Sequence, residues 1–125
     1  LLARSHTAQA QEVETMTALA YDEEATRRLL AVYTTPDVVA QREAFVRLLA
    51  PQPGERVVDV GSGPGFLASA IADAVQSTGA VCGIEISEPL NAVARAHCGD
   101  KAWVEISHGD ATRLPYPNAF FDAAI

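Results

Sequence analysis

The sequence VVDVGSGPGFL, at residues 57–67, carries the clearest structural signal in this chain. A short β-branched apolar run leads into three glycines at alternate positions, and an apolar pattern with helical spacing follows at once. β-Branched runs of this kind are typical of strands that are buried on both faces of a parallel sheet. Glycines permit positive φ and let a ligand approach the backbone, and the helix behind them presents free amide groups. We therefore predict a central strand, a ligand-binding turn and a helix.

Strands and helices are predicted to alternate after this turn. A helix is expected over residues 67–75, a second buried strand over residues 80–84 and a second helix over residues 87–97. Residues 103–107 predict a third strand, and a fourth begins at Phe121. This alternation indicates an α/β fold with a Rossmann-like, doubly wound parallel sheet. Because crossovers are right-handed, the second and third strands lie on one side of the first, which predicts the strand order 3-2-1-4.

Two helices are predicted before the first strand. Apolar residues recur at helical spacing over residues 22–33, and Thr35 is placed as the N-cap of a helix over residues 36–50. Arg42 falls within the apolar stripe of the second helix, so either its guanidinium meets an anion or its stem extends to solvent. Residues 1–20 are polar and rich in alanine, which indicates a frayed arm or a loosely docked helix.

Composition argues against several functional classes. The net charge of −7 repels phosphate backbones and anionic lipid surfaces, so nucleic acid is not expected as a partner. No apolar run approaches the roughly 20 residues of a membrane span, and the opening LLARSHTAQAQ lacks the features of a signal peptide. A cytoplasmic protein is therefore expected. Cys82 and Cys98 are expected to be buried free thiols, and no metal site is predicted.

Candidate ligand contacts follow two of the neighbouring strands. Glu85 ends the second strand, where a carboxylate can accept hydrogen bonds from both hydroxyls of a ribose, although a solvated strand-end glutamate is the alternative. Asp110 follows the third strand and can accept from an exocyclic amine, and the Ala111 amide can donate to a ring nitrogen. Ligands of open α/β sheets bind at the carboxyl edge where the strand order reverses. We therefore expect these contacts to converge with the glycine turn in one crevice.

The spacing of the glycines helps to distinguish between classes of nucleoside cofactor. The dinucleotide fingerprint G-x-G-x-x-G has a third glycine where helix and strand pack closely, but this position is Phe66 here. The spacing in this chain is G-x-G-x-G instead. This departure counts against a nicotinamide or flavin cofactor, and an NAD-type oxidoreductase domain is kept as an alternative.

Three motifs occur in order along the chain: VVDVGSGPG at 57–65, GIEIS at 83–87 and HGDATRLPYPNAFFDAAI at 108–125. Together they resemble class I S-adenosylmethionine-dependent methyltransferases, most of all the group that includes ubiquinone-biosynthesis and arsenite methyltransferases. The resemblance covers residues 33–125. It implies the N-terminal half of the class I methyltransferase fold, S-adenosylmethionine as cofactor with S-adenosylhomocysteine as product, and methyl transfer to a small molecule.

The resemblance also implies a set of cofactor contacts. They are Asp59, Gly61, Ser62, Gly63 and Gly65 at the glycine turn, Glu85 at the ribose hydroxyls, and Ile86, Asp110 and Ala111 at the adenine. YTTPDVVAQR, at residues 33–42, resembles the lid that precedes the first strand in this group, and we name it the lid segment. Within it, Tyr33, Thr35 and Arg42 are expected to close over the methionine end, with Arg42 facing its carboxylate.

Two parts are thus expected: an N-terminal helical arm and lid over residues 1–50, and a cofactor-binding half-domain over residues 51–125. The family fold continues beyond a fourth strand, and the later elements supply much of the acceptor pocket. We therefore expect the cofactor-binding half of a methyltransferase, with no catalytic residue assigned. A non-catalytic nucleoside-binding fragment is the alternative. An uncovered strand at residues 121–125 predicts a homodimer through that edge.

Overall fold

The computed structural model describes residues 22–125, so the arm expected over residues 1–20 lies outside the described part. The predicted alternation of helices and strands is present, and the bounds differ from the predicted ones by at most two residues. The elements are α2 (Glu23–Tyr33), α3 (Pro36–Leu49), β1 (Arg56–Val60), α4 (Phe66–Val75), β2 (Ala80–Glu85), α5 (Glu88–His97), β3 (Val104–His108) and β4 (Ala123–Ala124).

The strands form one parallel sheet in the order β3-β2-β1-β4, which confirms the predicted order. β1 is central, with β2 paired along its whole length on one side and the short β4 on the other. The strand order reverses between β1 and β4, which is where ligands of open α/β sheets commonly bind. β3 lies at an edge of the sheet, which explains why Glu105 is exposed in the middle of this strand.

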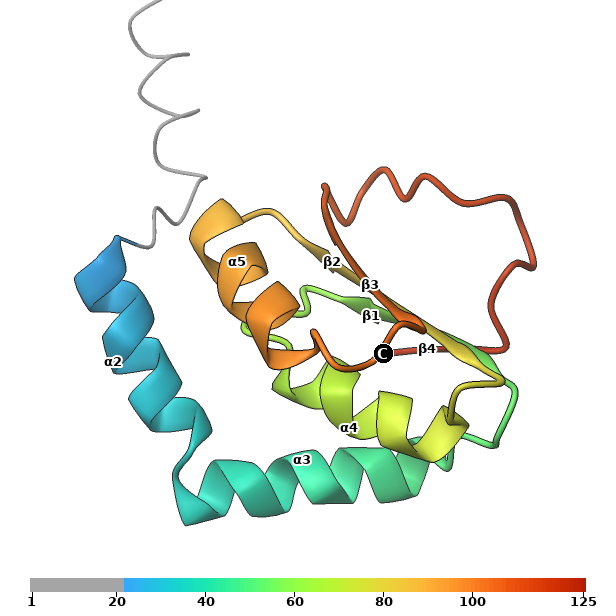
Figure 1. Cartoon of the computed structure of the whole chain (residues 1–125), viewed down its shortest axis with the longest axis horizontal. Coiled ribbons are helices and arrows are strands. Elements are labelled where there is room, and N and C mark those ends of the chain that lie inside the picture. The colour runs from blue at the N-terminus through green and yellow to red at the C-terminus, as the bar shows by residue number, and fades with distance from the viewer. Residues whose placement is uncertain (1–21) are drawn as a thin grey trace, which may run out of the picture.

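α4 and α5 lie together on one face of the sheet (Figure 1). The core is between α4 and the strands, and its fully buried side chains are Val57, Ala68, Ile71, Ala72, Val75 and Val81. The Trp103 indole donates to the Ala72 carbonyl at 2.9 Å, which joins the start of β3 to α4. The segment between β3 and β4 loops out on the other side of the sheet (Figure 1) and contains the mutually contacting rings of Tyr116, Phe120 and Phe121.

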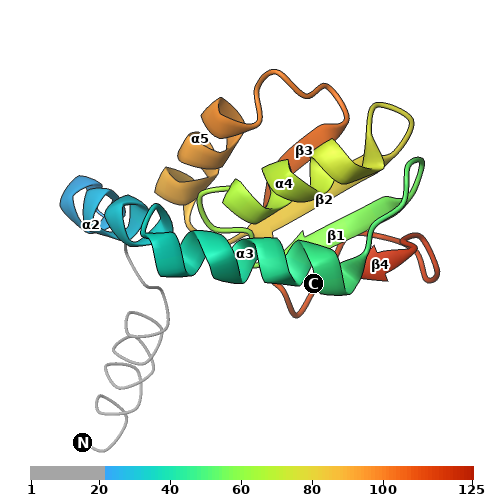
Figure 2. The ribbon, with the colours of Figure 1, turned by 90° about the horizontal axis from the view of Figure 1, so that it is seen from below.

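The N-terminal helices lie outside this helical layer, with α2 against α5 and α3 against α4 (Figure 2). Asp22 caps α2, since its Oδ1 accepts a hydrogen bond from the Ala25 amide at 2.7 Å. Thr35 occupies the N-cap position of α3, as predicted, but its side chain makes no capping bond there. Its hydroxyl donates instead to the Val32 carbonyl at 2.8 Å, because the tight connection between the helices brings that carbonyl within reach.

Both N-terminal helices bury little of their surface. α3 has no fully buried side chain, and Thr26 is the one such residue of α2. Val46 and Leu49 pack against the edge of the core, as the predicted apolar stripe of this helix requires. Phe45 is 43% exposed because it faces a cavity rather than the core. A small number of side-chain contacts therefore holds these helices in place.

The remaining sequence features concern thiols, metals and membranes. Cys82 and Cys98 are free and buried, and burial raises the pKa of both thiols. Within residues 22–125 we find no grouping of His, Cys, Asp and Glu side chains able to ligate a metal ion. No helix in this part of the chain has the length and apolar character that crossing a bilayer demands.

Candidate functional site

Two adjoining cavities lie at the carboxyl ends of β1 and β2. The first has a volume of about 300 Å³ and is lined by Val32, Tyr33, Val38, Gln41, Arg42, Phe45, Asp59, Gly61, Ser62 and Leu67. The second has a volume of about 240 Å³ and is lined by Leu29, Tyr33, Gly61, Gly63, Glu85, Ile86, Ser87 and Leu90. Tyr33 and Gly61 line both cavities, so the two spaces meet between the lid segment and the glycine turn.

The glycine turn is tied to the neighbouring strand through its backbone. The amides of Gly61 and Ser62 both donate to the Ile84 carbonyl, at 2.7 and 3.1 Å. Gly63 has a φ of 53°, and a Cβ at this position would lie only 3.2 Å from the hydroxyl oxygen of Tyr33. Glycine is required here because the backbone is left-handed and because the tyrosine approaches it closely. The turn thus presents bare backbone to both cavities.

Glu85 is held in place at the end of β2. Its Oε2 accepts a hydrogen bond from the Gly63 amide at 3.1 Å, and its Oε1 accepts one from the Ser87 amide at 2.9 Å. The Asn91 side chain donates to the Glu85 carbonyl at 3.0 Å, which anchors the backbone of the same residue. A carboxylate offers about four acceptor positions, so these two amide bonds leave capacity for further donors. Glu85 is therefore a preformed acceptor beside the second cavity.

Asp59 is a buried acid in the wall of the first cavity. It is only 4% exposed, and its Oδ2 has no hydrogen-bond partner among the described residues. Its pKa is raised to about 6, chiefly by burial and also by the negative charge of Glu85, while a backbone hydrogen bond from Ala68 acts in the opposite direction. A buried carboxylate with one oxygen left without a partner is costly, so this position favours either a proton or a cationic group of a ligand.

The raised pKa of Asp59 predicts a pH-dependent stability. Because the folded-state pKa of about 6 lies above the ordinary aspartate value of 3.8, the favourable contribution is complete below pH 3.8 and is lost as the pH rises through about 6. The stability of Asp59→Asn, which cannot ionise, should therefore increase relative to that of the wild type by roughly 3 kcal/mol between strongly acidic pH and pH 7. Urea unfolding of both proteins at several pH values tests this. An equal difference at pH 4 and pH 7 would contradict it.

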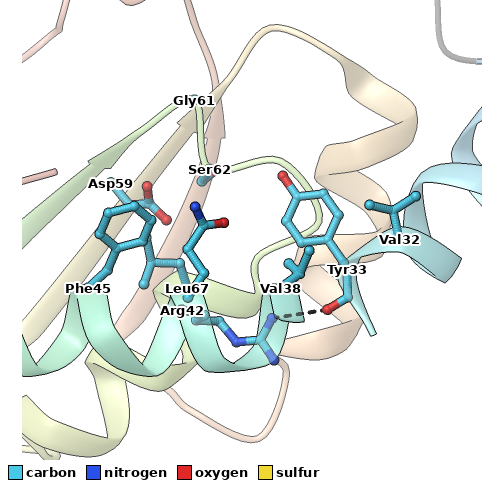
Figure 3. A pocket seen from close by; sticks show the side chains of 10 residues that line it. Val32, Tyr33, Val38, Arg42, Phe45, Asp59, Gly61, Ser62 and Leu67 are labelled. Atoms are coloured by element: carbon cyan, nitrogen blue, oxygen red, sulfur yellow. Dashed lines mark hydrogen bonds between the residues drawn. The ribbon is translucent and has the colours of Figure 1, made fainter. Parts of the chain in front are cut away.

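The lid segment contributes Tyr33 and Arg42 to the cavities but not Thr35. Figure 3 shows the Tyr33 side chain pointing toward the glycine turn, whereas the Arg42 guanidinium is directed away from Asp59 and toward the Tyr33 carbonyl, although Arg42 lines the first cavity. Arg42 meets no anionic side chain within residues 22–125, and it does not simply extend to solvent. Its guanidinium donates to the Tyr33 carbonyl at 3.3 Å and lies 5.1 Å from the centre of the Phe66 ring. Thr35 lines neither cavity.

The residues that follow β3 do not lie with the residues at the carboxyl ends of β1 and β2. Asp110 is exposed, and its Oδ1 accepts hydrogen bonds from the amide and the hydroxyl of Thr112, both at 2.8 Å. These bonds hold the pKa of Asp110 below its ordinary value. Neither Asp110 nor Ala111 lines either of these two cavities, whereas Ile86, 55% exposed, lines the second one. The predicted convergence thus holds for β1 and β2, because a local turn keeps the carboxylate of Asp110 beside its own loop.

Some cavity residues have no counterpart in the sequence-based set. The first cavity adds Val32, Val38, Gln41, Phe45 and Leu67, and the second adds Leu29, Ser87 and Leu90. Most of them belong to the apolar stripes of predicted helices, where side chains that face a core and side chains that face a cavity look alike in sequence. Gln41 was detectable only as the neighbour of Arg42. Conversely Gly65 lines neither cavity, because its α-carbon faces Ala94 of α5.

This geometry can be compared with known proteins. A family model described as a methyltransferase domain matches residues 57–125, which include the glycine turn, Glu85 and all four strands except the first residue of β1. The chain belongs to this family. The match confirms the resemblance drawn from the three sequence motifs.

Individual relatives of this methyltransferase domain share one type of reaction. A 2-phytyl-1,4-naphtoquinone methyltransferase of Synechococcus elongatus is 40% identical over 86 residues, covering 63% of this chain and 35% of the relative. A protein-L-isoaspartate O-methyltransferase of Pyrobaculum islandicum is 34% identical over 98 residues, covering 76% and 46%. The chain therefore spans between about a third and about a half of the length of these curated relatives.

A solved structure shows the same arrangement. It is a SAM-dependent methyltransferase of Thiobacillus denitrificans in complex with S-adenosyl-L-homocysteine. The two structures superpose with a TM-score of 0.57 at 26% sequence identity, covering 72% of this chain and 35% of that one. The fold of the methyltransferase domain therefore agrees with that of a solved family member.

Proposed function

We propose that this methyltransferase domain binds S-adenosylmethionine across the two cavities and forms the cofactor-binding part of a methyltransferase that acts on a small molecule. The proposal rests on two acidic side chains, Glu85 and Asp59, that lie beside a turn whose glycines leave the backbone uncovered. Glu85 is preformed beside the second cavity, and the Oδ2 atom of Asp59, in the wall of the first cavity, has no partner among the described residues. Gly61 lies where the two spaces meet. A nucleoside joined to an amino acid has ribose hydroxyls at one end and an ammonium group at the other, and these groups match the two acids.

The nucleoside end fits the second cavity. Ribose hydroxyls are donors, and Glu85 is a charged acceptor with both oxygens already oriented by amides. Ile86 and Leu90 supply apolar surface in the same cavity, which suits a base. In this proposal Asp110 and Ala111 reach the adenine only if the bonds from Thr112 to Asp110 are exchanged for bonds to the base.

The amino-acid end fits the first cavity. The ammonium and carboxylate groups of an amino acid need an acidic and a basic partner in the site. Asp59 and Arg42 both line the first cavity. The buried Asp59 carboxylate would receive the ammonium group, which satisfies its Oδ2. Arg42 would exchange its long bond to the Tyr33 carbonyl for the carboxylate of the ligand. Substituting Arg42 by alanine tests this role through cofactor affinity.

Methyl transfer from this cofactor requires the protein mainly to position the reactants. When bound, S-adenosylmethionine supplies an already activated methyl group on a sulfonium, which an acceptor can take by in-line displacement. The residues of this domain then orient the ligand and exclude water. Gly61 and Tyr33 lie at the junction of the two cavities, where the sulfonium of a ligand that spans both would lie. We assign no catalytic residue.

The acceptor, the location and the assembly are also part of the proposal. An acidic chain suits a small acceptor better than a nucleic acid, and the Synechococcus relative is named for a naphthoquinone. The Pyrobaculum relative is named for a protein residue, so the class of acceptor needs its own test. We propose a cytoplasmic protein, and a homodimer through residues 121–125, where β4 is an edge of the described sheet.

Calorimetric titration of the full chain tests the cofactor. We expect S-adenosylhomocysteine and S-adenosylmethionine to bind and NAD not to bind. Binding of NAD alone would favour the oxidoreductase alternative, and binding of none of the three would refute the proposal. Transfer of a labelled methyl group to quinol-type acceptors or to peptides would then distinguish an active enzyme from a non-catalytic nucleoside-binding fragment.

A further inference from the structure

Phe66 is the residue that replaces the third glycine of the dinucleotide fingerprint, and it begins α4. Its ring has three close partners from three other helices. It stacks on Tyr33 with 5.7 Å between ring centres and an angle of 17°. The Arg42 guanidinium lies 5.1 Å from its centre, and the His97 ring lies 4.4 Å away at a tilt of 58°. Phe66 is thus the meeting point of α2, α3, α4 and α5.

Phe66 contacts the walls of the site without lining it. Tyr33 lines both cavities and Arg42 lines the first, but Phe66 lines neither. The helices that carry Tyr33 and Arg42 have few other anchors, because α3 buries no side chain fully and α2 buries only Thr26. Ring stacking and a cation over a ring are each appreciable attractions at this degree of exposure. The placement of the lid segment therefore depends on this ring.

We propose that Phe66 is a positioning residue that fixes Tyr33 and Arg42 over the cofactor cavities. This inference rests on the proposed function, since the lid segment matters to the extent that the cavities hold the cofactor. Phe66 acts through Tyr33 and Arg42 rather than on the ligand. The core does not depend on it, because Ala68, Ile71, Ala72 and Val75 bury the inner face of α4 while Phe66 is only half-buried.

The test compares Phe66→Leu with a matched control in the full chain. The control is Phe120→Leu, because the Phe120 ring also contacts other rings and lies 4.9 Å below the Arg56 guanidinium, yet lines neither cofactor cavity. Two quantities are measured: the dissociation constant of S-adenosylhomocysteine by calorimetry, and amide hydrogen exchange over residues 23–49 without ligand. Exchange over β1 and β2 serves as the internal reference.

We expect Phe66→Leu to weaken S-adenosylhomocysteine binding on the order of ten-fold. Exchange over residues 23–49 should become faster while exchange over β1 and β2 stays unchanged. Phe120→Leu should alter neither quantity, and Phe66→Tyr, which keeps the ring, should restore both. Wild-type exchange over residues 23–49 in Phe66→Leu would overturn the inference, as would equally faster exchange in the strands. If the wild type binds no S-adenosylhomocysteine, the proposed function fails. The comparison of amide hydrogen exchange between Phe66→Leu and the wild type still tests the role of Phe66 in that case.

Discussion

Replacing Gly65 with alanine is expected to lower the free energy of unfolding by roughly 3–5 kcal/mol. Gly65 has a φ of 81°, a conformation that costs an L-residue roughly 1–2 kcal/mol. A Cβ there would also lie 2.8 Å from Cβ and 3.0 Å from Cα of Ala94. Backbone atoms of a packed helix cannot move aside as a flexible side chain can, so α4 and α5 would have to separate.

The control for this prediction is Gly54→Ala. Gly54 has a similar φ of 90°, but the nearest atom to an added Cβ would be the Thr78 hydroxyl oxygen at 3.9 Å. This variant therefore carries the backbone strain without the steric overlap and should lose only roughly 1–2 kcal/mol. Urea denaturation followed by circular dichroism measures both. Equal losses in the two variants would show that the approach of α5 to Gly65 has no energetic importance.

Glu85→Ala is expected to weaken S-adenosylhomocysteine binding by at least about a hundred-fold. Each hydrogen bond to a charged group contributes roughly 1.5–3 kcal/mol, and the variant removes two acceptors for the ribose. It also frees the Gly63 amide, so the glycine turn loses its tie to this side chain. Glu85→Gln, which keeps one oxygen, should lie between the alanine variant and the wild type. Calorimetry with S-adenosylhomocysteine measures the series.

Glu105→Gln is the matched control, because Glu105 is an exposed glutamate on the adjacent strand and lines neither cavity. Its affinity should equal that of the wild type. A second readout is the pKa of Asp59, which the charge of Glu85 raises. In Glu85→Ala this pKa should fall, and carboxyl NMR titration would record the fall. Unchanged ligand affinity in Glu85→Ala would remove this residue from the proposed site.

The elements and their order were predictable because each depends on short-range patterns. β-Branched runs, glycines and proline positions determine local backbone preference, and the right-handed crossover rule then leaves one arrangement for the first three strands. The N-cap position of Thr35 was predicted for the same reason. The hydroxyl bond of Thr35 to Val32 was not, because it depends on how closely two helices approach each other.

The candidate site was predictable only where backbone geometry dictates it. The glycine turn and Glu85 end adjacent parallel strands, so their proximity follows from the topology. Asp110 follows the next strand, yet Thr112, two residues further, engages its carboxylate in a local turn. An acid that faces a ligand and an acid that closes its own turn have the same sequence signature.

The sequence alone determined the fold class, the strand order and the family of this chain, because these follow from hydrophobic periodicity, turn residues and motif spacing. Only the tertiary structure decided that Gly65 serves helix packing, that Asp59 is buried with its Oδ2 unpaired among the described residues, and that Arg42 lies over Phe66. These facts depend on distances between elements that are far apart in the chain. Local patterns specify each element, whereas burial and charge environment exist only once the elements have packed together.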